Sequence, residues 1–189
     1  MIYLKKENKK EFIEWIKPIV VAIIFALAIR TFIFTPIVVD GASMMPTYED
    51  GDKVIVNKIS KQIAEYERYD VIVFDAGEDN YIKRVIGLPG EHIAYKDDIL
   101  YVNREPYVEP YLEEYKKKLI DGGTLTEDFR LEEYTGKLTI PDGYLFVVGD
   151  NRRHSSDSRD PEVGLIPMDK VLGKANIIFY PLDNIGIVK

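Results

Sequence analysis

The sequence contains no cysteine, only two histidines and a single tryptophan. Without cysteine the chain can form neither disulfide bonds nor thiolate zinc sites, and it cannot use a thiol as a nucleophile or redox centre. Basic residues are in the minority, because 25 lysines and arginines face 32 aspartates and glutamates, which gives a formal net charge of −7. That acidic excess argues against nucleic acid as the main partner, since phosphate binding requires a basic face. The length of 189 residues suits one domain of ordinary size.

Charge is distributed unevenly along the chain. Residues 1–17 hold five lysines and three glutamates, a net charge of +2, whereas residues 36–189 hold 19 basic and 29 acidic side chains, a net charge of −10. Between them, the apolar segment 18–34 carries Arg30 as its single charged residue. As a helix this segment would span about 25 Å, slightly less than the ~30 Å hydrocarbon core of a bilayer. Pro36 is expected to end that helix.

These features predict a transmembrane anchor over residues 18–35. Lysines before an apolar span mark the cytoplasmic side, so residues 1–17 are predicted to be a cytoplasmic tail and residues 36–189 an extracytoplasmic body. A buried core helix is an alternative, although an apolar run preceded by lysines disfavours it. A cleavable signal peptide is another, because Ala26-Leu27-Ala28 is a small-x-small triplet. The intact mass of the mature protein separates cleavage from anchoring.

After residue 36 the sequence changes to short β-branched runs separated by glycine, proline, aspartate and asparagine. Such runs predict a mainly β fold, an antiparallel β body with a small inserted segment, preceded by one N-terminal transmembrane helix. The insertion is predicted over residues 97–138, and its acidic, lysine-rich part, 110–136, as a solvated helix or loop. The predicted strands are residues 37–39, 53–57, 70–74, 81–86, 93–96, 100–102, 143–148 and 174–180.

Two stretches carry residues suited to nucleophilic catalysis. Ser43 follows the apolar segment closely, in a turn where Gly41 permits a positive φ. Lys83 and Arg84 are adjacent in an apolar strand, so alternation directs one of them toward the side of its apolar neighbours. An ordinary lysine is only about 0.04% neutral at pH 7, whereas burial lowers its pKa and makes it a competent general base. Taken singly, a hydrogen-bonding serine in a turn and two solvated cations on an edge strand account for the same residues.

A third stretch, residues 149–160, has polar or charged side chains at eleven of its twelve positions, directly after an apolar run. Aspartate, asparagine, serine and arginine can satisfy one another and hold a catalytic residue in place. A calcium loop is an alternative, but the ligand spacing does not match the twelve-residue pattern. A Ser-His-Asp triad is another. His92 has no evident acidic partner, however, and His154 stands in a polar loop typical of the surface. No metal or cofactor is expected.

Together these stretches resemble the type I signal peptidase family, in the short single-anchor form typical of Gram-positive bacteria. The resemblance covers nearly the whole chain. Each motif is weak alone, but their occurrence in this order is specific. The motifs are Ser43-Met44-Met45-Pro46-Thr47, Gly51-Asp52-Lys53-Val54, residues 81–90 (YIKRVIGLPG), Gly149-Asp150-Asn151-Arg152 and Ser155-x-Asp157-Ser158-Arg159.

The resemblance implies a membrane-bound serine endopeptidase that removes N-terminal signal peptides from exported preproteins, cutting after small-x-small motifs. It implies that Ser43 is the nucleophile and Lys83 the general base of a Ser-Lys dyad that forms an acyl-enzyme. Gly41 stands where some relatives carry a serine of the oxyanion hole, so the Ser43 amide, with help from Gly41, is expected to hold the oxyanion. Tyr69 stands where relatives often have glycine.

Supporting roles and partners follow from the same resemblance. Ser155 is expected to hydrogen-bond the lysine, while Asp150, Asp157 and Arg159 brace the loop. The implied partners are preprotein signal peptides and membrane lipid, without nucleic acid or metal. The implied location is the cell membrane, single-pass, with the N-terminus cytoplasmic and the catalytic domain extracellular. The residues implied in substrate binding are Ile37, Val39, Met44, Tyr81 and Ile82.

Two rival functions remain open. A self-cleaving SOS-type repressor is a Ser-Lys protease of the same fold, but it predicts a DNA-binding head where this chain has an apolar segment. A membrane-anchored, non-catalytic β module would leave the co-occurrence of Ser43, Lys83 and Ser155 unexplained.

Overall fold

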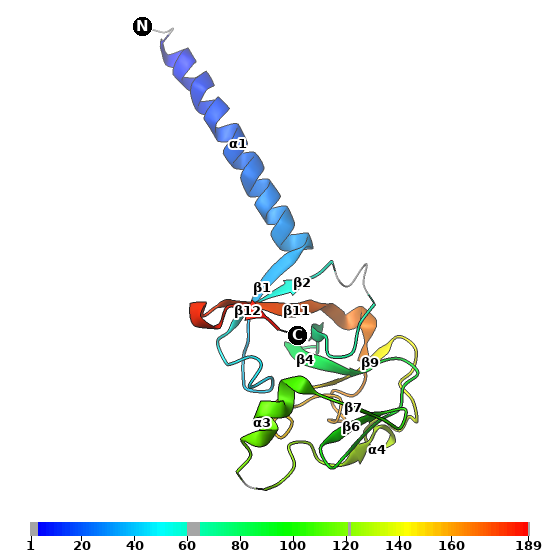
Figure 1. Ribbon diagram of the computed structural model, residues 1–189. Coiled ribbons are helices and arrows are strands. Elements are labelled where there is room, and N and C mark those ends of the chain that lie inside the picture. The colour runs from blue at the N-terminus through cyan, green and yellow to red at the C-terminus, as the bar shows by residue number, and fades with distance from the viewer. Residues whose placement is uncertain (1–3, 60–64, 121, 189) are drawn as a thin grey trace.

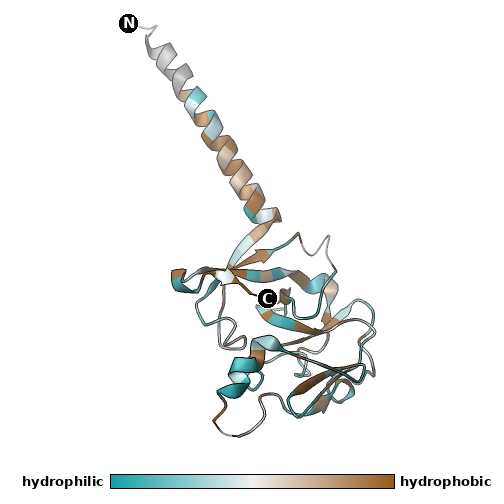
Figure 2. Cartoon of the chain, viewed as in Figure 1, coloured by the Kyte–Doolittle hydropathy of each residue, from teal (hydrophilic) through white to brown (hydrophobic). Residues whose placement is uncertain are grey.

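The computed structural model describes residues 4–59, 65–120 and 122–188. A long N-terminal helix, α1 (Leu4–Phe32), stands away from a β body that contains two sheets (Figure 1). Its part Glu14–Phe32 has a mean hydropathy of 1.9, and none of that window is buried against the body. Figure 2 shows brown, hydrophobic residues along much of this helix. By length and composition this helix can cross a membrane.

The helix ends earlier than Pro36, which was the predicted stop. It finishes at Phe32, and Pro36 lies inside strand β1 (Phe34–Val38). β1 is the edge strand of its sheet and, among the described residues, pairs with β2 (Lys53–Asn57) alone. An edge strand tolerates proline because one of its sides needs no hydrogen-bond donors. The expectation that Pro36 ends the helix was therefore wrong.

The larger sheet is antiparallel throughout, with strand order β1-β2-β11-β3-β4-β9-β10 and β12 paired to β11. Valine and isoleucine side chains cover both of its faces, so its central strands are buried on both sides. This arrangement confirms the mainly β, antiparallel body. Its remaining strands are β3 (Val71–Asp75), β4 (Asn80–Gly87), β9 (Tyr144–Val148), β10 (Ile166–Pro167), β11 (Val171–Tyr180) and β12 (Gly186–Ile187).

The smaller sheet has the order β7-β6-β5-β8. Its core includes Tyr95 and Phe129, which pack in one hydrophobic cluster with Phe146 and Val148 of β9. The two sheets therefore contact each other through this cluster. The smaller sheet begins at residue 93, ahead of the predicted insertion start at 97. Its strands are β5 (Ile93–Lys96), β6 (Ile99–Val102), β7 (Glu105–Tyr107) and β8 (Phe129–Arg130).

Residues 110–136 are less solvated than their composition predicts. Leu112, Leu125 and Leu131 are buried, and the ring of Tyr111 lies 3.9 Å from the guanidinium of Arg84. These three leucines belong to the core of the body, whereas Glu113, Glu114, Glu127, Asp128 and Glu133 are exposed. The short helices of the body are η1 (Pro110–Leu112), α3 (Glu113–Lys117), α4 (Leu131–Thr135), η2 (Met168–Lys170) and η3 (Leu182–Asn184).

Candidate active site

The structure brings Ser43 and Lys83 together. Ser43 lies in the turn that follows β1, and Lys83 lies in the middle of β4. Lys83 Nζ is 2.7 Å from Ser43 Oγ and 3.0 Å from the carbonyl oxygen of Ile82. The lysine side chain is buried, with 4% exposure. Within the described chain, no carboxylate lies within hydrogen-bond distance of its Nζ.

Burial changes the acidity of this lysine. Loss of solvent lowers the pKa of Lys83 from 10.5 to about 8, although the charges of Asp157 and Asp150 act in the opposite direction. With a pKa near 8 about a tenth of the lysine is neutral at pH 7, compared with about 0.04% for an ordinary lysine. A neutral amine 2.7 Å from a hydroxyl can accept its proton, so this pair has the geometry of a base and a nucleophile.

The turn around Ser43 is held at its start by Gly41. Gly41 has φ of +85°, as its predicted role in a turn requires, and its N–H donates to Asp50 Oδ1 at 2.8 Å. The N–H of Gly41 is therefore already engaged in the turn, and in this structure it is not a free donor beside Ser43. The N–H of Ser43 itself donates no hydrogen bond within the described chain, which leaves it available to an incoming group.

Residues 149–160, the polar stretch after β9, hydrogen-bond to the backbone of the turn that carries Ser43. The N–H of Asn151 donates to Ser43 O at 3.1 Å, and its Nδ2 donates to Ala42 O at 3.0 Å. Gly149 lies so close that a Cβ there would meet Ser43 O at 2.4 Å and Ser155 Oγ at 2.2 Å. Sequence reasoning assigned no role to Asn151, because its contacts span more than a hundred residues.

Asp157 and Arg159 are hydrogen-bonded to each other within this loop. Asp157 is fully buried and accepts from the N–H of Gly149 at 3.0 Å and from Arg159 Nε and Nη2 at 2.8 Å each. Burial by itself raises the pKa of Asp157, but the hydrogen bonds and charge of Arg159 outweigh it and hold the pKa below its usual range. The carboxylate is therefore ionised at neutral pH.

The expected hydrogen bond between Ser155 and Lys83 is not formed. Ser155 Oγ is buried against the backbone of Gly149 and has no hydrogen bond of good geometry in the described chain. The Ser155 hydroxyl helps to lower the pKa of the Asp157 carboxyl. Lys83 instead directs its Nζ to Ser43 and to the Ile82 carbonyl, which leaves the hydroxyl of Ser155 unused.

Arg84 lies on the opposite face of β4 from Lys83 and is also buried. Its Nε and Nη2 donate to Asp150 Oδ1 and Oδ2 at 2.9 and 2.7 Å, and Thr47 Oγ1 donates to the same carboxylate. Arg84 Nη1 donates to Tyr69 O at 2.9 Å, and Tyr69 has φ of 76°, a left-handed conformation that glycine adopts more readily than other residues. Asp150 thus links Arg84 to Thr47, which lies in the turn that carries Ser43.

The residues predicted to bind substrate divide by exposure. Ile37 and Tyr81 are partly exposed, and Lys83 Nζ lies 5.2 Å from the centre of the Tyr81 ring. Val39 and Ile82 are 3% and 8% exposed and belong to the same hydrophobic core cluster. Met44 is 0% exposed and packs within that cluster, so its side chain is part of the hydrophobic core in this structure.

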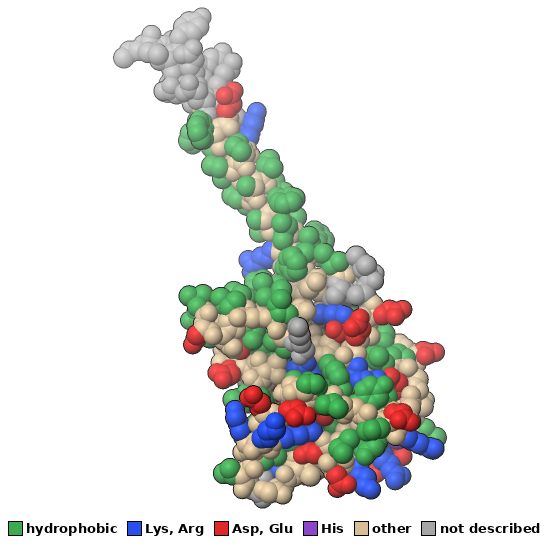
Figure 3. Space-filling view, viewed as in Figure 1, with side chains coloured by type: hydrophobic (Ala, Val, Ile, Leu, Met, Phe, Trp, Pro, Cys, Tyr) green, Lys and Arg blue, Asp and Glu red, His purple; other side chains and the backbone are tan. Residues whose placement is uncertain are grey.

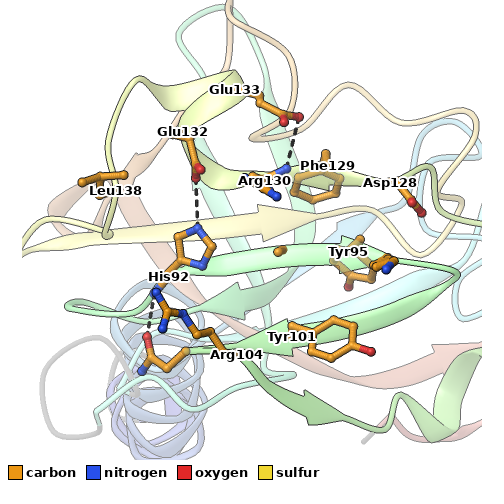
Figure 4. A pocket seen from close by; sticks show the side chains of 13 residues that line it. His92, Tyr95, Tyr101, Arg104, Asp128, Phe129, Arg130, Glu132, Glu133 and Leu138 are labelled. Atoms are coloured by element: carbon orange, nitrogen blue, oxygen red, sulfur yellow. Dashed lines mark hydrogen bonds and ion pairs between the residues drawn. The ribbon is translucent and has the colours of Figure 1, made fainter.

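The histidines lie elsewhere. His92 Nε2 is 3.0 Å from Glu132 Oε2, so the sequence wrongly suggested that His92 lacks an acidic partner (Figure 4). This pair lines a cavity of about 1140 Å³ on the smaller sheet, whose lining includes neither Ser43 nor Lys83. His154 is exposed. No group of three or more acidic or histidine side chains in the described ranges could hold a metal ion.

Comparisons with known proteins identify the relatives of this chain. The family model described as "Signal peptidase, peptidase S26" matches residues 12–180. Signal peptidase I of Bacillus caldolyticus is 48% identical over 179 residues, which cover 94% of this chain and 96% of that protein. Signal peptidase I S of Bacillus subtilis (strain 168) is 43% identical over 185 residues, 95% and 97% of the two chains. The crystal structure of a signal peptidase I from Enterococcus faecalis V583 is 40% identical and superimposes with a TM-score of 0.54, covering 58% of this chain and 96% of that one.

Proposed function

Because this chain belongs to the signal peptidase family, peptidase S26, we propose that it cuts the signal peptide from exported preproteins with Ser43 as nucleophile and Lys83 as general base. Membership makes it a serine peptidase. The observation that carries the assignment of residues is the 2.7 Å contact between Lys83 Nζ and Ser43 Oγ in a buried site.

The proposed reaction is acyl transfer in two stages. Neutral Lys83 takes the proton of the Ser43 hydroxyl as its oxygen attacks the scissile carbonyl carbon. The lysine then gives that proton to the leaving amine, which departs as the N-terminus of the mature protein and leaves the signal peptide as an ester on Ser43. Neutral Lys83 next removes a proton from water, which attacks the ester. Ser43 recovers its proton and the signal peptide leaves as a carboxylic acid.

Charge develops on the carbonyl oxygen in both stages. The N–H of Ser43 supports an oxyanion-binding role because it lies beside the nucleophile and makes no hydrogen bond within the described residues. A donor of this kind contributes most when it is already oriented before the reaction.

Cutting after small-x-small motifs fits an extended substrate. Alternate side chains of an extended chain point to the same side, so two shallow apolar sites read two residues separated by one. Ile37 and Tyr81 support this proposal because both are partly exposed and Tyr81 adjoins Lys83. Large residues at either substrate position would be excluded by the shallow surface.

Attachment to a membrane is proposed from α1 and from the surface at its base. Exposed apolar side chains continue from the helix onto the adjoining face of the body (Figure 3). With the lysines of residues 1–17 on the cytoplasmic side, this face would rest on the outer leaflet and bring the site to preproteins in the same membrane. The exposed side chains of this face are Phe34, Val38, Ile177, Leu182, Ile185 and Ile187.

The test is cleavage of a preprotein by the purified full chain in detergent. The preprotein carries alanine at the last and third-last residues of its signal peptide, and a matched preprotein carries leucine at both. We expect the wild-type chain to release the mature protein from the first alone, and Ser43→Ala and Lys83→Ala to release none while remaining folded. Cleavage by folded Ser43→Ala, or equal cleavage of both preproteins, contradicts the proposal.

A further inference from the structure

The peptide unit that joins Ala42 to Ser43 is held by its carbonyl. Ala42 O accepts one hydrogen bond from Asn151 Nδ2 at 3.0 Å and another from the N–H of Met45 at 3.1 Å. A trans peptide unit is planar, and its C=O and N–H point in opposite directions. Fixing the carbonyl of Ala42 therefore fixes the direction in which the N–H of Ser43 points.

Asn151 is itself firmly placed. It is 7% exposed, its N–H donates to Ser43 O at 3.1 Å, and its own carbonyl accepts from the N–H of His154 at 3.0 Å. The next residue, Arg152, has a fully buried side chain that donates to Glu109 and, at 2.7 Å, to the hydroxyl of Tyr95. The smaller sheet and the residues before α3 thus anchor the segment that carries Asn151.

The carboxamide of Asn151 is only half satisfied. Its Nδ2 is bonded to Ala42 O, whereas its Oδ1 is buried and has no hydrogen-bond partner within the described residues. A buried acceptor without a partner destabilises a fold by about 1–3 kcal/mol. An apolar side chain of the same shape would avoid that loss, so stability alone gives no reason for asparagine here.

We propose that Asn151 is a positioning residue for the oxyanion donor: its Nδ2 orients the Ala42–Ser43 peptide unit so that the N–H of Ser43 faces the developing negative charge. The inference rests on the proposed function, because it concerns the same nucleophile. Within the described residues the side chain of Asn151 makes no hydrogen bond to Lys83, and its Nδ2 donates to Ala42 O.

This role has a kinetic signature of its own. Loss of a preorganised oxyanion donor lowers kcat by about 10²–10³-fold, and a donor that is present but less well oriented loses less. Without Asn151 Nδ2 we expect kcat to fall by about 10–100-fold while KM changes by less than about threefold. The midpoint of the pH profile should stay near 8, because the environment that sets the pKa of Lys83 is unchanged.

The variant Asn151→Leu makes the test sharp. Leucine has nearly the shape of asparagine, and it removes the unpaired Oδ1 together with the donor, so the fold should be retained. Ser156→Ala is the matched control, since Ser156 stands in the same polar stretch, is exposed and donates to Asp160 at 2.6 Å. We expect the control to match the wild type and the leucine variant to show the kcat loss at an unchanged midpoint, with the full-length chain in detergent.

Two results would overturn the inference. One is a folded Asn151→Leu chain with wild-type kcat, and the other is a kcat loss that comes with a shifted pH midpoint, which would place the effect on Lys83. If the leucine variant does not fold, Asn151→Ala is measured in its place against the same criteria. Inactivity of the wild-type chain, or activity of Ser43→Ala, would instead count against the proposed function.

Discussion

Arg84 and Asp150 face each other through two charge-assisted hydrogen bonds of 2.9 and 2.7 Å, with both side chains fully buried. Lys83, which precedes Arg84 in the chain, points to the other face of β4. Its Nζ donates to the Ser43 hydroxyl and to the Ile82 carbonyl instead. Burial disfavours both cations, but the carboxylate of Asp150 more than compensates at Arg84 and raises its pKa. At Lys83 burial prevails and the pKa falls to about 8. One strand thus carries a permanent cation and a titratable amine side by side.

The first prediction concerns pH. Only neutral Lys83 can accept the proton of Ser43, so the rate should fall as pH decreases through about 8. Between pH 8 and pH 6 the neutral fraction drops about 50-fold, and kcat/KM for a preprotein should follow it. The measurement is the cleavage rate between pH 5.5 and 10, with the thermal unfolding profile followed at each pH as the control. A flat profile down to pH 5.5 would rule out a lysine base.

The second prediction concerns the stability cost of that lysine. The pKa of Lys83 is about 8 in the folded chain and 10.5 when solvated, so between these values the unfolded chain binds more protons and stability rises with pH. Below pH 8 the penalty is complete and amounts to about 3 kcal/mol at most. Lys83→Met should therefore abolish cleavage yet unfold at a higher temperature than the wild type at pH 7. The difference between the two unfolding temperatures should decrease from pH 8 to pH 10. An equal or lower unfolding temperature at pH 7 would contradict this account.

The third prediction concerns Gly149. A methyl group there would lie 2.4 Å from Ser43 O and 2.2 Å from Ser155 Oγ, so Gly149→Ala must displace the backbone of the nucleophile. A displacement of about 1 Å at a reacting group reduces rates by about 100-fold, and we expect a loss of at least that size in kcat. Gly186→Ala is the control, because a Cβ there would meet nothing nearer than 4.0 Å. Wild-type activity in a folded Gly149→Ala chain would show that the close approach is not required.

The fourth prediction concerns the buried ion pair. Removing one partner leaves an uncompensated charge, so Asp150→Leu should lower the free energy of unfolding by about 3–5 kcal/mol. Replacing both residues, as in Arg84→Met with Asp150→Leu, should recover much of that loss because no buried charge then remains. Chemical unfolding of the single and double variants provides the measurement. A double variant less stable than either single one would mean that the pair stabilises the fold by more than mutual neutralisation.

Much of the fold could be predicted because local signals agree with it. β2 and β5 have the predicted bounds, since turn residues flank both runs, and Asp97 and Asp98 adopt the positive φ of the expected turn. β7 and β8 were missed because strands of three and two residues leave no periodic pattern. Pro36 was misinterpreted because the edge position that tolerates it is set by the sheet and not by its neighbours in sequence.

For the site, the sequence predicted which residues take part but not which atoms they contact. The motifs placed Ser43 and Lys83 in one site, and the structure brings them into contact. Which hydroxyl the lysine meets, and whether Met44 faces substrate or core, depends on side-chain orientations that a sequence does not encode locally. Tyr111 and Asn151 act on residues at least 27 positions away in the chain, so their contacts exist only once the sheets have packed.

The junction between helix and body has a consequence for where a membrane-bound peptidase can cut. One residue, Ile33, separates α1 from β1, and the joint is tied by hydrogen bonds from Lys58 N to Ile33 O at 2.9 Å and from Thr35 Oγ1 to Arg30 O at 3.2 Å. Such a joint gives the body little freedom to rise or sink on its helix. If α1 crosses a membrane as proposed, Ser43 and Lys83 would be held at one fixed height above the bilayer, and the distance from the membrane surface to the cleaved bond would be fixed with them.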